Sequence, residues 1–394
     1  MSTILAVVTL VFALLVALPA VYLAILAGVT FVSRRPPRSE SAKPLRFAIL
    51  VPAHDEESAI ARTTTALLRL DYPPDCFTVH VVADNCADAT AAVARASGAF
   101  VHERDDPSRP GKGAALNWLV RRVSSEVGDV DAFVLVDADS ELSANFLRVM
   151  ADHLGAGAQA VQALHLVDVA EDRPLVRIRE LAFELTCHLR PLANTILGGS
   201  SGLQGTGMGF AAPLLLRYPW SETSVVEDGE LALRLIRDGH RIALATTASV
   251  RQAMPTTFSQ AGSQAVRWER GRFDHFDETV SLICRGLRRR DRNSLLTGLN
   301  ALIPPFSALA AATVLGLAVA AALGDMVLAV LALASIVSLL VYTLRGASLG
   351  GLTPRTLLRI VLWAPPYVAW KLWVLALAGS GVGRGQWTRT KRAA

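Results

Sequence analysis

The chain has 394 residues, of which 52% are hydrophobic, and its 39 Lys and Arg outnumber its 34 Asp and Glu to give a net charge of +5. A positive mean hydropathy argues against a chain that lies wholly in water, and the apolar residues gather at the two ends. Many basic residues lie beside those apolar ends, where anionic lipid headgroups attract them, so the charge requires no nucleic-acid partner.

The first apolar segment, residues 3–32, contains no charged side chain. A helix of this length, at about 1.5 Å per residue, more than crosses a hydrocarbon core of about 30 Å. The uncharged start and the long apolar run argue against a cleaved signal peptide, so we predict a transmembrane anchor over 1–32. A basic linker, 33–45, follows. Its charges place the middle of the chain in the cytoplasm by the positive-inside rule; they are Arg34, Arg35, Arg38 and Lys43, joined by Arg46.

The middle of the chain, residues 46–292, alternates short apolar runs with longer helical patterns. The expected strands are 46–51, 78–82, 99–102 and 132–136. One expected helix ends at Leu70, and two others cover 87–96 and 113–123. This alternation predicts an α/β domain with a doubly wound, mostly parallel sheet. Ligand-binding residues then belong at the carboxyl ends of the strands, and Asp84 and Asp137 both fall just past such an end.

Residues 293–380 are predicted to form a C-terminal membrane domain, preceded by an arginine cluster that marks the cytoplasmic side: Arg285, Arg288, Arg289, Arg290 and Arg292. Two spans are expected, over 301–323 and 326–344. The turn between them, whose only charge is Asp325, should lie outside the cell.

The last apolar segment, 360–378, contains Pro365, Pro366 and Lys371. A crossing would leave the basic tail, 381–394, outside, against the positive-inside rule. We therefore favour a kinked re-entrant or interfacial helix pair over a full crossing.

Cysteine usage gives no sign of a metal finger or a disulfide framework. The spacing contains no CxxC pair, and a reducing cytosol keeps thiols free. The thiols concerned are Cys76, Cys86, Cys187 and Cys284.

Asp137 and Asp139 follow an apolar strand, so both carboxylates can project toward one site that suits a hard divalent cation. An acidic turn capping a helix near Leu142 is the alternative. Lys112 lies between two glycines at the start of a helix, where the backbone can approach an anion. It lacks the first glycine and the following Ser or Thr of a P-loop, so the alternatives are a diphosphate contact and a solvated lysine.

Two further patterns lie downstream. Glu227 and Asp228 precede a helix, where carboxylates also favour a first turn. Gln264 and Trp268 share a helix face at i, i+4. Arg267 lies between them in sequence and can bind phosphate oxygens, and the indole face of Trp268 can stack on a sugar ring. A basic amphipathic helix on the membrane surface is the alternative for this pattern.

In this order, Asp84, Asp137-Ala138-Asp139, Glu227-Asp228 and Gln264 to Trp268 resemble the D, DxD, ED and QxxRW series of membrane-embedded family-2 glycosyltransferases. That group includes cellulose and hyaluronan synthases, and the resemblance covers residues 46 to 280. It implies a GT-A-like fold and inverting, metal-dependent transfer from a nucleoside-diphosphate sugar, with UDP as the expected nucleotide. Many relatives carry a second acidic residue just before the first aspartate, where this chain has Ala83.

The resemblance also implies roles for individual residues. Asp228 is the general base, with Glu227 beside it, and Mg²⁺ or Mn²⁺ binds at Asp139 and Asp137. The donor contacts it implies are Glu56, Asp84, Lys112, Asp137, Asp139, Gln264 and Arg267. The acceptor contacts it implies are Gly205, Thr206, Gly207 and Trp268.

The acceptor remains open between two classes. QxxRW is common in processive synthases and favours a growing extracellular polysaccharide, exported with help from an oligomer or a partner protein. A membrane domain with three confident spans favours a single transfer to a membrane lipid. We lean toward the polymer and expect a multi-pass plasma-membrane protein with a cytoplasmic catalytic domain. A catalytically inactive nucleotide- or carbohydrate-binding protein is the rival from another class.

Overall fold

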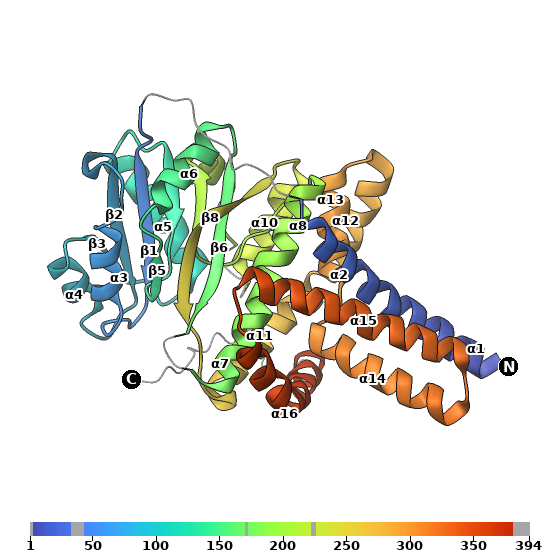
Figure 1. The fold of residues 1–394 in the computed structure, drawn as a ribbon. Coiled ribbons are helices and arrows are strands. Elements are labelled where there is room, and N and C mark those ends of the chain that lie inside the picture. Colours follow the sequence, from blue (N-terminus) through green and yellow to red (C-terminus); the bar gives the residue numbers. More distant parts are fainter. Residues whose placement is uncertain (1–2, 33–42, 170–171, 222–225, 381–394) are drawn as a thin grey trace.

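The computed structural model describes residues 3–32, 43–169, 172–221 and 226–380. They form an α/β domain beside a bundle of long apolar helices, with shorter amphipathic helices where the two parts meet (Figure 1). Most of the predicted basic linker, with Arg34, Arg35 and Arg38, and the predicted basic tail lie outside the described residues.

An eight-stranded sheet forms the centre of the α/β domain, in the order β3-β2-β1-β4-β7-β6-β8-β5. The four strands on the amino-terminal side are parallel, β7 is antiparallel to both of its neighbours, and β6 is parallel to β8. Their bounds are β1 Phe47–Ala53, β2 Phe77–Asp84, β3 Phe100–Arg104, β4 Ala132–Leu135, β5 Ser140–Leu142, β6 Ala160–Asp168, β7 Met208–Ala211 and β8 Ile242–Ala253. The predicted mostly parallel, doubly wound sheet is confirmed.

Both faces of the sheet are buried, as the two-residue period of a strand requires. In β1, Phe47, Ile49 and Val51 pack on one face, and Ala48 and Leu50 pack on the other. The first face is covered by α3 (Ile60–Leu67), α4 (Thr90–Ala96) and α6 (Phe146–Gly155). The second is covered by α5 (Lys112–Glu126), α9 (Ala212–Arg217) and α10 (Glu227–Arg237). A short helix, η2 (Pro74–Cys76), leads into β2.

Within the described ranges, four helices are long and apolar enough to cross a membrane, judged by length and composition. The first is continuous over α1 (Thr3–Phe12), a π-helical turn η1 (Ala13–Ala17) and α2 (Leu18–Val29). The others are α14 (Phe306–Leu323), α15 (Met326–Leu349) and α16 (Pro354–Gly379). The first three candidates pack into one apolar core that also includes residues of the amphipathic helices.

The ends of this bundle are held by polar contacts. At the end near the α/β domain, Arg345 Nε donates to Thr30 Oγ1 at 2.8 Å, and its guanidinium lies 4.2 Å from the ring centre of Phe31. At the far end, Asp325 caps α15 and accepts a hydrogen bond from Thr9 Oγ1 at 3.4 Å. Contacts of this kind fix how α2 and α15 lie against each other.

Five amphipathic helices and one π-helical segment connect the sheet with the bundle (Figure 1). They are α7 (Pro174–Phe183), η3 (Glu184–Leu189), α8 (Arg190–Leu197), α11 (Phe258–Asp274), α12 (Phe276–Arg289) and α13 (Arg292–Leu302). The predicted span over 301–323 starts later than expected, because residues 301–302 belong to α13 and the helix resumes at Phe306 after Pro304-Pro305.

The last apolar segment is one helix of 26 residues that contains Pro365 and Pro366. The predicted helix pair is therefore wrong: two consecutive prolines remove backbone donors without ending the helix. Its main packing partners are α11 and α7, with a smaller contact to α14. Lys371 lies 2.8 Å from the buried carboxylate of Glu269 on α11, so an ion pair joins α16 to the amphipathic layer.

Candidate active site

Lys112 is the point where three separate stretches of the chain meet. Its amine donates to Asp137 Oδ1 at 2.6 Å and to the carbonyl oxygen of Gly205 at 2.7 Å, and it lies 3.8 Å from Glu227 Oε1. It is the first residue of α5, and Gly111, with a φ of +116°, makes the turn that starts the helix. The predicted DxD, ED and lysine motifs therefore share one cation.

Asp137 and Asp139 lie just past β4 and are tied together by a side chain that the sequence did not single out. Gln252, near the end of β8, donates to Asp139 Oδ1 at 2.9 Å and to Asp137 Oδ2 at 3.4 Å. The backbone amide of Asp137 donates to Thr206 Oγ1 at 3.1 Å, which fixes the turn. Two carboxylates held this way form the hard oxygen donor set that Mg²⁺ and Mn²⁺ prefer.

Asp228 follows Glu227 in the first turn of α10. Burial and the neighbouring carboxylate of Glu227 raise the pKa of Asp228 to about 6, although Lys112 acts in the opposite direction. Burial of Lys112 disfavours its charge, yet Asp137 and Glu227 raise the pKa of that amine above its ordinary value. Near neutral pH the site thus combines a permanent cation with a carboxylate poised to take up a proton.

The glycine-rich loop before β7 divides into one residue that lines the site and two that support it. Gly205 has a φ of +83°, and a Cβ at that position would lie 3.5 Å from Asp228 Oδ2. Thr206 is fully buried and its hydroxyl is used within the protein, so its side chain supports the loop, and the acceptor contact of this loop stays a prediction. Gly207 is buried against Val250, which a Cβ would approach to 2.5 Å, so its small size serves packing on β8.

Gly205→Ala should lower transfer activity by at least tenfold while the protein still folds. The added methyl group stands beside the Asp228 carboxylate, where the reacting groups must fit, and the positive φ adds strain of about 1 kcal/mol. Activity and thermal unfolding of the purified variant check this. Gly207→Ala is the matched comparison, because its clash with Val250 should lower Tm more than Gly205→Ala does. Unchanged activity in Gly205→Ala would remove this residue from the site.

Asp84 ends β2, and its carboxylate is buried. It pairs with the guanidinium of Arg104 at the end of β3, and Arg104 Nη2 also donates to the carbonyl of Arg109 at 2.8 Å. Arg104 therefore links the predicted nucleotide contact to the loop that leads into Lys112. Sequence reasoning missed Arg104, since a strand-end arginine carries no motif of its own.

Glu56 lies in the loop after β1, beside the loop after β2. Its amide donates to Thr90 Oγ1 at 2.8 Å. The same two loops bring Asp55, Cys86 and Asp88 within 4.8 Å of one another. The carboxylates of Asp55 and Asp88 accept backbone amide hydrogens there, so this cluster fastens one loop to the other.

The Gln264, Arg267 and Trp268 pattern lies on α11, where a second missed arginine organises it. Arg179 on α7 is buried, donates to Gln264 Oε1 at 2.6 Å, and lies 5.6 Å from the ring centre of Trp268. Trp268 remains 37% exposed, while Arg267 Nε is buried with no hydrogen-bond acceptor among the described residues. The indole is thus accessible to a ligand, and the Arg267 Nε is a buried donor without an acceptor in the described part of the chain.

A line of aromatic contacts connects α11 with the DxD turn. The ring of Trp268 lies 6.0 Å from that of Phe183, which lies 5.1 Å from His165 on β6. Burial lowers the pKa of His165 to about 4, with Asp137 opposing, so the imidazole is neutral near pH 7. The structure places Lys112, Asp137, Asp139, Gly205, Glu227 and Asp228 in one cluster; Asp84 and the α11 residues flank it through Arg104 and through this aromatic line.

Comparison with known families gives one match that covers more than half of the chain. A family model described as "Glycosyltransferase like family 2" matches residues 44–271. Among solved structures, a mannosyltransferase from Pyrobaculum calidifontis in complex with GDP-Man and Mn²⁺ is similar in fold, with a TM-score of 0.62 and 18% identity over 95% of this chain and 97% of that one. The GT-A-like arrangement expected of the α/β domain is confirmed.

Curated relatives include enzymes of both acceptor classes. A β-monoglucosyldiacylglycerol synthase of Trichormus variabilis is 26% identical over 268 residues, which is 66% of this chain and 56% of the relative. A UDP-forming cellulose synthase catalytic subunit of Komagataeibacter sucrofermentans is 24% identical over 64% of this chain and 34% of the relative. The chain thus spans about half the length of the first curated relatives it matches.

Proposed function

Because the chain belongs to glycosyltransferase family 2, we propose that it transfers a sugar from a nucleoside diphosphate to an acceptor hydroxyl with inversion at the anomeric carbon. The observation that carries this proposal is the cluster at Lys112, where a base with a pKa of about 6 faces the cation and the DxD turn. A direct displacement needs a base that takes the acceptor proton and a cation that stabilises negative charge, and Asp228 and Lys112 would supply these two groups.

In the proposed reaction, Asp228 accepts the proton of the acceptor hydroxyl as the oxygen attacks the anomeric carbon. The new carbon–oxygen bond forms while the bond to the donor phosphate breaks, and that electron pair leaves with the nucleoside diphosphate. Lys112 lies between the base and the DxD turn and stabilises the negative charge of both. Asp137 and Asp139 would hold Mg²⁺ or Mn²⁺, which when bound neutralises the leaving diphosphate.

Residues on either side of this cluster would hold the donor. Asp84 and Glu56 lie at the strand ends where the nucleoside belongs in an α/β sheet. Arg267 has a buried Nε without a protein acceptor, which suits a phosphate oxygen. We propose a UDP-linked sugar as the first donor to test.

For the acceptor, we propose the hydroxyl of a membrane lipid. The first three candidate spans pack side chain against side chain into one apolar core, and α16 packs chiefly on α11 and α7. A polymer channel within one chain needs an open path between such helices, whereas a lipid reaches the site from the bilayer beside α11. The similarity to glucosyldiacylglycerol synthases supports this choice.

A growing polysaccharide is the second candidate. The exposed ring of Trp268 suits a sugar platform, and the similarity to a cellulose synthase subunit supports it. In either case we propose that the α/β domain faces the cytosol of a plasma-membrane protein, since the arginines of α12 and Arg345 lie at that end of the bundle.

The purified full chain in detergent, given UDP- and GDP-sugars with Mn²⁺ or Mg²⁺ and diacylglycerol, should release nucleoside diphosphate and form a chloroform-soluble glycolipid. Mass analysis of the product from labelled donor separates the candidates, because a ladder of many repeats means polymer synthesis. The same assay without added metal tests the proposed role of Asp137 and Asp139. Absence of turnover with every donor and with both acceptor classes would contradict the proposed function and support a binding protein.

A further inference from the structure

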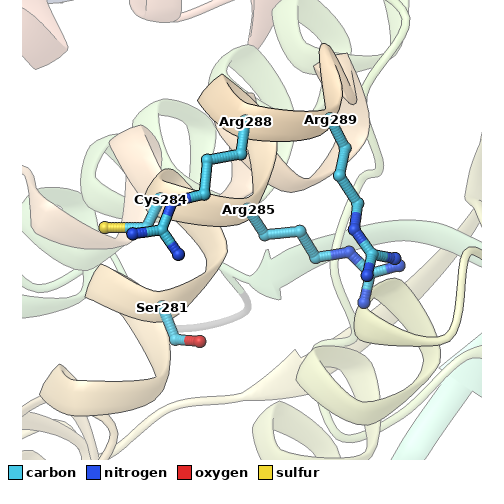
Figure 2. Close-up of a pocket in the computed structure, with 5 residues that line it drawn as sticks. All are labelled: Ser281, Cys284, Arg285, Arg288 and Arg289. Carbon is cyan, nitrogen blue, oxygen red and sulfur yellow. The ribbon is translucent and has the colours of Figure 1, made fainter.

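An arginine-lined cavity lies on α12, away from the cluster at Lys112. Its volume is about 310 Å3, and its lining residues are Ser281, Cys284, Arg285, Arg288 and Arg289. Figure 2 shows Arg285 and Arg289 extending the same way from the helix, while Arg288 reaches toward Cys284. Guanidinium groups that line one cavity form a site for an anion with several oxygens.

Among the described residues, these arginines form no close ion pair, and Arg285 Nε is buried without a hydrogen-bond acceptor. Asp291, the next carboxylate along the chain, attracts Arg285, which helps to lower the pKa of Asp291. Its oxygens are nevertheless used in capping α13, where they accept from Ser294 Oγ at 2.6 Å and from the amide of Asn293 at 3.0 Å. The cavity is therefore electropositive, with one buried donor that an anion could satisfy.

Arginines in a last helical turn also interact favourably with the helix dipole. That interaction accounts for Arg288 and Arg289, which occupy the last turn of α12. It does not account for Arg285, which stands one turn earlier with a buried Nε. A bound anion accounts for all three.

The surroundings of the cavity point to the bilayer as the source of the anion. Phe276, Val280 and Leu287 are exposed along one stripe of α12, at spacings of four and seven residues. The helix packs on α13, which leads through Pro304-Pro305 into the candidate span α14, and both lie near the α/β-domain end of α2 (Figure 1). The arginines lie on the side of α12 opposite this stripe, and an apolar face opposed to an arginine-rich polar face is the pattern of a helix in the membrane interface.

We propose that the arginine cavity of α12 binds the phosphate of an anionic phospholipid headgroup, while the apolar stripe on the opposite side of the helix enters the acyl boundary. This proposal depends on the candidate spans crossing a bilayer and not on the transfer reaction. A phospholipid bound in this cavity would hold α12 and α13 against the membrane surface. It would thereby fix the distance between the α/β domain and the membrane.

Cys284 provides a direct readout, because its thiol is exposed and lines the same cavity. The full chain in detergent is treated with N-ethylmaleimide in the presence of dihexanoyl phosphatidylglycerol, dihexanoyl phosphatidylcholine or inorganic phosphate, and labelling is measured peptide by peptide. We expect phosphatidylglycerol to slow Cys284 labelling at least fivefold relative to phosphatidylcholine, since each arginine near an anionic surface contributes about fivefold in affinity. Cys76, which lies in η2 of the α/β domain, is the internal reference.

The triple variant R285Q/R288Q/R289Q should lose this protection. R62Q/R69Q/R121Q is the matched control, because it removes the same charge from exposed positions of the α/β domain and should keep the protection. Equal slowing by phosphatidylcholine would overturn the proposal, as would equal protection by inorganic phosphate, which would assign the cavity to a free anion. An equal loss in the control variant would also overturn it, because net charge alone would then explain the effect.

Discussion

Asp228→Asn should lower the rate of sugar transfer by about 10² to 10⁴ while leaving donor binding nearly unchanged. The substitution removes a carboxylate whose pKa, raised to about 6, suits a general base near neutral pH. It leaves Lys112, Asp137 and Asp139 in place for the donor. Single-turnover rates and donor affinity, measured separately on the same preparation, check both halves. Near wild-type transfer would show that another residue takes the proton.

The pH dependence of the wild-type enzyme gives an independent test of the same assignment. A base works when it is deprotonated, so kcat/KM should rise with pH through about 6 and then level off. Asp228→Asn should lose this limb. A wild-type profile that is flat between pH 5 and pH 8 would contradict the assignment.

Asp228→Asn should raise the thermal stability of the protein above pH 6, although it lowers the rate of transfer. The pKa of Asp228 is raised from 3.8 to about 6, so the folded state binds this proton more tightly than the unfolded state. Stability from this group is therefore present at low pH, is lost as pH rises from about 4 to 6, and stays lost above that range. At pH 8 the neutral Asn avoids up to about 3 kcal/mol of that loss. The variant should have a higher Tm than the wild type at pH 8 and a similar Tm at pH 4.

Lys112→Met should be nearly inactive and clearly less stable. It leaves Asp137, Glu227 and Asp228 facing one another without the cation between them, and breaking a buried pair in this way costs about 3 kcal/mol. Loss of one charge-assisted donor at the reacting centre lowers kcat by about 10² to 10³. In this variant the rise of kcat/KM with pH should shift to above pH 6, because in the wild type Lys112 lowers the pKa of Asp228. Thermal unfolding and a pH–rate profile measure these effects.

Two control variants separate charge from folding in this experiment. Lys112→Arg keeps the cation and should retain most of the stability. The double variant Lys112→Met with Asp137→Asn removes one of the uncompensated carboxylates, so it should recover stability without recovering activity. An unmoved pH limb in Lys112→Met would mean that the lysine and the base do not interact.

Local patterns in the sequence were sufficient to predict the strands in the amino-terminal half of the sheet and to single out the residues that meet at Lys112. Short, continuously apolar runs such as β1 indicate strands buried on both faces of a parallel sheet, and the place of Asp137 follows from the rule that ligand groups lie at strand ends. Lys112 was recognisable because its glycines mark a helix start. These features depend on residues within a few positions of one another.

The supporting side chains could not be predicted, because their partners are distant in sequence. Gln252 bonds to Asp139 across 113 positions, and Arg179 bonds to Gln264 across 85. The arrangement of the loop at Gly205 to Gly207 was not predictable for a different reason. A run of small residues does not reveal which of them faces the site, and here Thr206 is buried between two glycines with positive φ.

The ion pair between Glu269 and Lys371 has a consequence for the biogenesis of the protein. Lys371 belongs to an apolar helix that is synthesised after α11, and a lysine in such a helix opposes partition into lipid. Its carboxylate partner is on α11, which is synthesised about a hundred residues earlier and also carries Arg272, 3.8 Å from the same carboxylate. Docking of α16 thus gives Lys371 a buried counterion on α11, so insertion of this helix should be favoured once α11 has folded.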